Sequence, residues 1–314
     1  MREPLAIGVD IGGTQLRAAL VDGSGAILSR AAARTEASAG PHAVIRQIAG
    51  LVAEVTAGVD RAHLLGAGVS CPGPLDTISG TALGIPTLSG WVDIPVAAMI
   101  EAALGLPTRL ENDGIAAAHG EWRFGAGRGL DNLVYVTVST GIGGGVVLDG
   151  RLVHGRRGMA GHIGHMMVER DGELCSCGNR GCWEAYASGT AFSRAAEQHI
   201  AAAGAGSALD GLGRPDAKLV FDAARSGDGL ALALVAEEAD WLGIGMVSLA
   251  HLYSPEKIII GGGLANGLDL LAPGIAARLA GSAMPAFRDI GIVPAMLGDN
   301  PGLIGAAALF FPVR

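Results

Sequence analysis

The chain has 314 residues, of which 50% are hydrophobic and 17% are charged, with a mean hydropathy of +0.41 and a formal net charge of −8. Intrinsic disorder needs low hydrophobicity and high charge and is therefore excluded, and the length favours two packed domains. The 51 glycines follow no three-residue period, which excludes collagen, and no apolar run of about 20 residues is present that could span a membrane.

The basic residues are nearly all arginine, since Lys218 and Lys257 are the only lysines, and neither end carries a basic run. Binding along a nucleic-acid backbone needs clustered positive charge, so we expect a small-molecule partner instead. The first apolar stretch, residues 5–9, is too short for a signal peptide and is closed by Asp10. We expect a cytoplasmic protein.

In chain order, a strand-turn-strand-turn-strand pattern occurs twice, which predicts a duplicated architecture. The first copy has strands over 5–9, 16–21 and 26–31, and the second over 133–138, 145–148 and 151–154. Further strands are predicted over 65–69, 108–110 and 257–260, and helices over 43–57, 96–104, 114–122, 191–203, 230–252, 268–279 and 303–311. This alternation predicts an α/β protein of two lobes, with the ligand site in the cleft between them.

We expect the smaller lobe to comprise residues 1–117 and 300–314, and the larger lobe to comprise 118–299. Segment 204–215 is rich in glycine and small residues and is predicted to be a loop without chemistry of its own. Trp91 and Trp183 are assigned to the core.

Three glycine-rich turns follow predicted strands, and each offers backbone N–H groups to phosphate oxygens. In the first turn Asp10 is suited to hold Mg²⁺ through water, and Thr14 adds a hydroxyl. Each turn alone is equally consistent with an ordinary glycine turn, but three in one chain predict a phosphate clamp. The predicted nucleotide-binding residues are Asp10, Gly12, Gly13, Thr14, Gln15, Thr140, Gly141, Gly143, Gly144, Gly262 and Gly263.

Glu111-Asn112-Asp113 lies where a predicted strand ends and a helix begins. Phosphoryl transfer to an alcohol needs a carboxylate that accepts the hydroxyl proton, and Asp113 is a candidate for this base. The alternative is that Asp113 only caps the helix, because Asn and Asp are preferred at that position.

His165, Cys175, Cys177 and Cys182 form the most specific constellation of the chain. Three thiolates and one imidazole complete a tetrahedral Zn²⁺ shell, which predicts a closed structural site, a zinc knuckle over 165–182. The alternatives are a reduced thiol cluster or a disulfide, although Cys175 and Cys177 are too close in sequence to bridge well. Cys71 is left over and is assigned to packing.

These motifs together resemble the ROK family of bacterial sugar kinases and related repressors, over essentially the whole chain. The resemblance implies the two-lobed actin-like ATPase fold, similar to ribonuclease H, with duplicated βββαβα units. It also implies ATP as phosphoryl donor with Mg²⁺, a structural Zn²⁺, a homodimer, and Asp113 as base toward a sugar 6-hydroxyl. The sugar contacts implied are Asn112, Asp113, His162, His165 and Glu184, with His165 serving zinc through one ring nitrogen and the sugar through the other.

Two departures from glucose-type members bear on the substrate. His162 stands where these members usually have Glu, and Thr87 where they have Asn, whereas the run Ala160–His165 resembles bacterial N-acetylmannosamine kinases. Imidazole removes an acceptor for two hydroxyls, a loss better tolerated if the substrate carries an acylamino group at C2. The expected activity is therefore phosphorylation of N-acetylmannosamine at its 6-hydroxyl.

Two alternatives remain. One is a glucokinase or broad hexokinase of the same family. The other is a sugar-sensing regulator without catalysis. Because repressor members carry a helix-turn-helix before the first phosphate motif and only nine residues precede Asp10 here, we do not expect a DNA-binding repressor.

Overall fold

The computed structural model describes residues 4–203 and 206–312. The chain divides into two compact units, and each unit is assembled from segments that are not contiguous in the sequence. Unit 1 comprises Met1–Leu130, Gly145–Gly161 and Met296–Arg314, and unit 2 comprises Asp131–Gly144 and His162–Ala295. No break occurs at residue 117, because helix α3 (Asp113–Phe124) continues through it, and residues 145–161 belong with unit 1 rather than with the second lobe.

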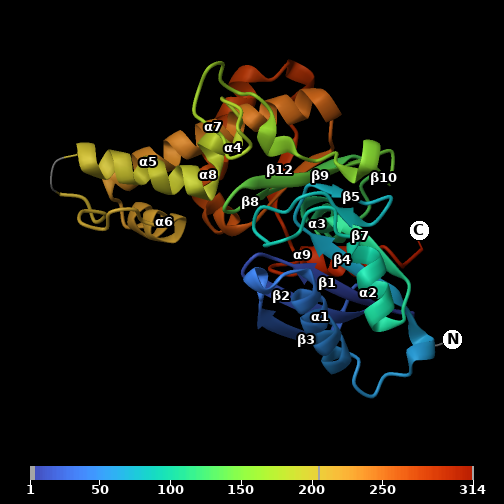
Figure 1. Cartoon of the computed structure of the whole chain (residues 1–314). Helices are drawn as coiled ribbons and strands as arrows, with labels where there is room; N and C mark the ends of the chain where they lie inside the picture. Colours follow the sequence, from blue (N-terminus) through green and yellow to red (C-terminus); the bar gives the residue numbers. More distant parts are fainter. Residues whose placement is uncertain (1–3, 204–205, 313–314) are drawn as a thin grey trace. The chain divides into compact units, whose positions relative to one another are not determined.

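Unit 1 is built on a five-stranded mixed sheet with the order β3-β2-β1-β4-β7 (Figure 1). The first three strands pair antiparallel, and β1, β4 and β7 run parallel, so their carboxyl ends lie at one edge. The strands are β1 (Leu5–Ile11), β2 (Gln15–Asp22), β3 (Ile27–Arg34), β4 (Leu64–Cys71) and β7 (Thr108–Asn112), with a small hairpin of β5 (Leu75–Asp76) and β6 (Thr81–Ala82).

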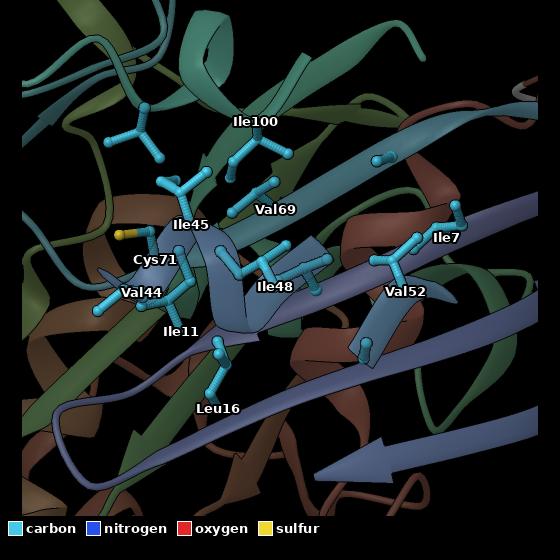
Figure 2. Close-up of a cluster of buried hydrophobic side chains, with 14 of the residues drawn as sticks. Ile7, Ile11, Leu16, Val44, Ile45, Ile48, Val52, Val69, Cys71 and Ile100 are labelled. Atoms are coloured by element: carbon cyan, nitrogen blue, oxygen red, sulfur yellow. The ribbon is translucent and has the colours of Figure 1, made fainter. Parts of the chain in front are cut away.

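Alternation along β1 covers both faces of this sheet. Ile7 and Ile11 join the cluster beneath α1 (Pro41–Val55) and α2 (Val96–Leu104), where Ile48 and Val52 of α1 point toward the strands (Figure 2). On the opposite face Ala6 packs with the buried side chains of α9 (Pro301–Ala308). Gly8 and Gly68 lie under α9 with no room for a Cβ, because it would overlap the carbonyl oxygens of Leu303 and Ala306.

The second sheet repeats the first, with the order β10-β9-β8-β11-β12. Its strands are β8 (Leu133–Val138), β9 (Ile142–Leu148), β10 (Arg151–Leu152), β11 (Lys257–Gly261) and β12 (Gly291–Pro294). Strand β11 runs parallel to β8 and β12. The duplicated pattern predicted from the sequence is therefore present in the structure.

The helices of unit 2 follow the segment of the candidate metal ligands, residues 165–182, and pack against one another around α7. They are α4 (Glu184–Ala187), α5 (Gly189–Ala202), α6 (Ala217–Arg225), α7 (Gly229–Tyr253) and α8 (Leu268–Ser282). Trp183 is fully buried between the knuckle and α7, where its indole N–H donates to the carbonyl of Trp241 at 2.8 Å, and Trp91 is buried in unit 1. Both tryptophans therefore belong to the core, as expected.

Most predicted elements are present within a few residues of their expected bounds, with the following differences. Strand β9 begins at Ile142, so the second glycine turn is shorter than expected. Helix α6 and strand β12 were not expected. Residues 204–205 of the predicted loop lie outside the described residues, and 206–215 form turns. Within the described ranges, no helix combines the length and apolarity required to cross a bilayer.

Candidate active site and metal centre

The carboxyl edge of the first sheet gathers polar side chains from three strands. The strand register sets Asp10 of β1 beside Ser70 of β4, and Ser70 beside Glu111 of β7. The hydroxyl of Ser70 donates to Asp10 Oδ1 at 2.7 Å. Residues separated by about a hundred positions in the sequence therefore lie at one edge, where parallel sheets bind ligands.

Asp10 also pairs with Arg17, which sequence analysis missed. The two face each other across the β1–β2 hairpin, and Arg17 Nε donates to Asp10 Oδ2 at 3.1 Å with a second, shorter bond from Nη2. The hairpin register could have predicted this pair, because residues directly opposite each other in a hairpin lie on the same face of the sheet. Arg17 occupies both lone pairs of Oδ2, whereas Oδ1 accepts one bond from Ser70 and keeps a second lone pair, so Asp10 fits Mg²⁺ held through a water molecule at Oδ1.

The first glycine turn is tightly closed. The N–H of Gly12 donates to the carbonyl of Gln15 at 2.9 Å and is therefore used within the turn rather than offered to phosphate. A Cβ on Gly13 would lie 2.9 Å from Cβ of Thr87, so glycine permits this close approach. The side chains of Thr14 and Gln15 are exposed.

Asn112, not Asp113, caps α3. Its Oδ1 accepts from the N–H groups of Gly114 at 3.0 Å and Ile115 at 3.4 Å. Asp113 is the first residue of the helix, and its Oδ1 accepts the adjacent N–H of Gly114, at 2.8 Å. Asn112 therefore takes the capping role that was the alternative for Asp113. As a carboxylate in the first turn of the helix, Asp113 is stabilised by the helix dipole.

Glu111, beside these two residues, is 3% exposed and pairs with His154, whose Nε2 lies 2.7 Å from Glu111 Oε2. The hydrogen bond to Glu111 raises the pKa of His154, although partial burial opposes the shift. Farther along α3, burial lowers the pKa of His119 to about 4, and Nδ1 of that ring lies 3.1 Å from the carbonyl oxygen of Gly305. No sequence pattern singled out either histidine.

In unit 2 the second glycine turn consists of Ser139, Thr140 and Gly141, closed by a 2.9 Å bond from the N–H of Ser139 to the carbonyl of Gly141. Gly143 and Gly144 lie in strand β9 instead of the turn, which corrects the expected geometry. A Cβ on Gly144 would overlap the carbonyl oxygen of Tyr135, so this glycine serves strand packing.

A cavity of about 460 Å³ in unit 2 brings the second and third glycine turns together, and its size suits a small-molecule ligand. Thr140 and Gly263 both line it, and Gly262 adjoins it with φ +83°. Arg214 and Lys218 also line the cavity. Arg214 comes from the loop that we expected to carry no chemistry. The two cations are paired with Glu197 and Asp222, and Asp216 also lines the cavity, so a phosphate would compete with these carboxylates for them.

His165, Cys175, Cys177 and Cys182 converge, with all four ligand atoms within 4.8 Å of one another. Cys177 Sγ lies 3.6 Å from Cys182 Sγ, and Cys175 Sγ lies 3.6 Å from His165 Nδ1. Tetrahedral Zn–S bonds of about 2.3 Å require S···S edges of about 3.8 Å, so the spacing fits zinc. All four cysteines are free, and a disulfide would need an S–S distance of about 2.05 Å.

The thiols of this cluster have opposite pKa shifts. The N–H of Asn179 lowers the pKa of Cys177, whereas burial raises the pKa of Cys182 to about 12. A bound dication favours the thiolate at every ligand, because metal binding releases the thiol protons.

Glu184 connects the knuckle to the second glycine turn. Its Oε2 accepts the N–H of Ile142 at 2.9 Å, and its Oε1 accepts the hydroxyl of Ser176 at 2.8 Å. The ring of His162 stacks near that of His165, with centroids 6.3 Å apart. His162 and Glu184, two predicted sugar residues of unit 2, therefore lie close to the candidate metal ligands, and the third, His165, is one of those ligands.

Comparison with known proteins identifies the family. The ROK family profile matches residues 6–312. The chain belongs to the ROK family. A glucokinase of Thermotoga maritima is 37% identical over 307 residues, covering 96% of both chains. An N-acetylmannosamine kinase of Escherichia fergusonii is 34% identical over 305 residues, covering 96% of this chain and 97% of the relative.

Among solved structures of the ROK family, a glucokinase from Streptomyces griseus in complex with glucose and AMPPNP matches with a TM-score of 0.83 and 38% identity. The match covers 97% of this chain and 98% of that one. The expected fold class, the mixed α/β actin-like ATPase fold of ROK sugar kinases, is confirmed. Overall identity is slightly higher to the glucokinase, so it gives no support to the expected preference for N-acetylmannosamine.

Proposed function

We propose that the chain is an ATP-dependent kinase that transfers the γ-phosphoryl group to the 6-hydroxyl of a hexose, with N-acetylmannosamine as its substrate. The observation that carries the proposal is the position of Asp113, a carboxylate at the start of α3 that is not needed as the helix cap. Family membership and the AMPPNP and glucose bound to the Streptomyces griseus relative support the donor and the substrate class.

In this reaction the sugar oxygen attacks the γ-phosphorus while the bond to the ADP oxygen breaks. Asp113 accepts the hydroxyl proton during the attack, and Asn112 orients the sugar. Arg214, Lys218 and the turns at Thr140 and Gly263 bind the nucleotide in unit 2, and the exposed Thr14 and Gln15 do so in unit 1. Mg²⁺, held by Asp10 through water, would neutralise charge on the phosphates.

The zinc ligands fix the polar groups around them. A zinc ion bound by His165 Nδ1 and the three thiolates would leave Nε2 of His165 for a sugar hydroxyl. Glu184 and His162, placed beside the knuckle, are the remaining sugar contacts of unit 2. The carboxylate of Glu184 accepts hydrogen bonds from Ser176 and from the N–H of Ile142, and these two bonds support its orientation toward the sugar.

The choice of N-acetylmannosamine depends on His162. An imidazole offers fewer acceptors for sugar hydroxyls than a carboxylate does, and this loss is better tolerated if C2 carries an acylamino group. Glucose is the second candidate, and the 37% identity to a glucokinase favours it. A non-catalytic sugar sensor is a third reading, but a sensor needs no base at Asp113.

A panel of purified sugars with ATP, followed by ADP release, distinguishes these functions. We expect the highest kcat/KM with N-acetylmannosamine, and a His162→Glu variant should move the preference toward glucose. The exposed His42 provides the control, because His42→Glu should leave the ratio unchanged. Faster turnover of glucose than of any N-acetylhexosamine would instead assign a glucokinase, and binding of a sugar without turnover would assign a sensor.

A further inference from the structure

Glu111 is a buried acid that the proposed chemistry does not use. It is 3% exposed and lies at the end of β7, directly before Asn112 and Asp113. A buried carboxylate is costly unless its oxygens are satisfied by donors. Both oxygens have partners here: Oε1 accepts the N–H of Asn112 at 2.9 Å, and Oε2 lies 2.7 Å from His154 Nε2.

His154 reaches Glu111 from a different part of unit 1. It follows strand β10, 43 residues along the chain from Glu111, and its side chain is 42% exposed. His154 is therefore the solvent-accessible member of the pair, and Glu111 is the buried one. The carbonyl of His154 accepts the N–H of Ala160 at 3.0 Å, which fixes the backbone of the segment that presents the ring.

The hydrogen bonds continue from Glu111 into helix α3. The N–H of Asn112 is held by Glu111, and the side chain of Asn112 holds the N–H groups of Gly114 and Ile115. Asp113 lies between these two attachments, so its backbone is fixed from the strand side and from the helix side. A change at His154 would thus reach the peptide that carries Asp113 through two intervening residues.

We propose that His154 and Glu111 form a positioning pair that holds Asp113 in the orientation required to accept the sugar hydroxyl proton. This inference rests on the proposed function, since it takes Asp113 as the base. His154 is a positioning residue in this scheme, because it acts through Glu111 and Asn112 and not on the sugar.

The charges around His154 favour a protonated ring. Glu111 from β7 raises its pKa, the carbonyl of Leu152 acts in the same direction, and His119 from α3 is a further titratable group that interacts with it. An imidazolium gives a stronger, charge-assisted bond to a carboxylate than a neutral ring does. The pair should therefore weaken as pH rises and His154 loses its proton.

The test compares His154→Leu with His154→Gln in the full chain. We expect His154→Leu to lower kcat roughly 10- to 100-fold, as for misplacement of a catalytic group by about 1 Å, with KM for ATP within about threefold. His154→Gln retains a donor toward Glu111 and should recover part of kcat. The wild type should lose kcat on the alkaline side, and His154→Gln should lack this loss because its amide does not titrate.

His199 supplies a matched control. It is 43% exposed, about as exposed as His154, and lies 3.5 Å from the exposed Glu237 in unit 2, so His199→Leu removes a histidine-carboxylate pair without touching α3. We expect kcat to stay unchanged in this variant. If His154→Leu is folded and keeps kcat within about twofold of the wild type, the positioning pair is refuted.

Amide hydrogen exchange separates this inference from the proposed function. His154→Leu should speed exchange at Asn112 and Gly114 whether or not a sugar is found that is phosphorylated, and unchanged exchange there would overturn the pair. If Asp113→Asn retained turnover, the proposed base would be wrong. If Asp113→Asn were inactive while His154→Leu remained active, only the positioning pair would fail.

Discussion

Ser176 of the zinc knuckle donates its hydroxyl to Glu184 at 2.8 Å, and the same carboxylate receives the N–H of Ile142 at the second glycine turn. The knuckle and the turn are thereby joined through one side chain. Ser176→Ala should leave zinc content unchanged but raise KM for the sugar about three- to tenfold, because Glu184 loses one charge-assisted bond. Metal analysis and steady-state kinetics measure both, and Ser282→Ala, at an exposed position at the end of α8, is the control. An unchanged KM would show that Ile142 alone suffices to orient Glu184.

Asp113→Asn should lower kcat about 10²- to 10⁴-fold, since the amide cannot accept the proton, while sugar affinity stays within a few fold. Stopped-assay kinetics and calorimetric titration of the sugar measure the two effects. Asp289→Asn, at an exposed position, should change neither. Equal turnover of the Asp113 variant and the wild type would remove Asp113 from its role as base.

The four-ligand geometry predicts about one zinc per chain in protein prepared without added metal, as measured by elemental analysis. Cys177→Ser should lose the metal and lower the melting temperature, because metal binding contributes to folding. Cys71→Ala is the matched control: it removes a cysteine outside the cluster and should keep the zinc. Zinc retained in full by the Cys177 variant would contradict the assignment.

His119 predicts a pH-dependent stability. Its pKa in the folded chain is about 4, below the ordinary 6.5, so the unfolded chain binds more protons between these values. The free energy of unfolding should therefore fall as pH drops through this window, by roughly 3 kcal/mol in total. Urea titrations at several pH values should show a smaller fall for His119→Asn. His42→Asn should match the wild type, and identical slopes in all three proteins would refute the prediction.

Gly305 allows α9 to touch α3 by backbone. A Cβ there would overlap the carbonyl oxygen of Ala116, so Gly305→Ala should lower the free energy of unfolding by about 1–3 kcal/mol. Gly50→Ala in α1 meets open space and should raise it by about 0.5–1 kcal/mol through helix propensity. Denaturant titration of both variants tests the contrast. A neutral Gly305 variant would mean that α9 shifts without cost.

Local patterns in the sequence predicted most of the strands and helices, because each carries its own periodicity and turn residues. The capping of α3 shows the limit, since Asn112 and Asp113 are both suited to cap a helix and only the backbone geometry assigns the cap to Asn112. Strand β12 was missed because it is a four-residue edge strand that ends in Pro294. Helix α6 had a usable signal in its N-cap, Asp216, which the preceding glycine-rich segment obscured.

For the site, residues grouped in one motif were predictable, and residues that meet through the fold were not. The four candidate metal ligands lie within eighteen positions of one another, so their convergence follows from spacing. Arg17 was in principle predictable from the hairpin register. His154, Ser70 and Arg214 reach their partners through sheet register or loop path, and nothing in their local sequence distinguishes them from ordinary surface residues.

Helix α9 completes the hydrophobic layer on one face of the first sheet, although about 170 residues separate it from the end of helix α3. Strand β1 precedes α9 by about 290 residues, so at about 5–20 residues per second it waits roughly 15–60 s during translation for that helix to be synthesised. Ala6, Ala19 and Val21 are exposed to water, or to chaperones, throughout this interval. The nascent chain is thus most prone to aggregation before the ribosome has finished it, and slower elongation would lengthen that period.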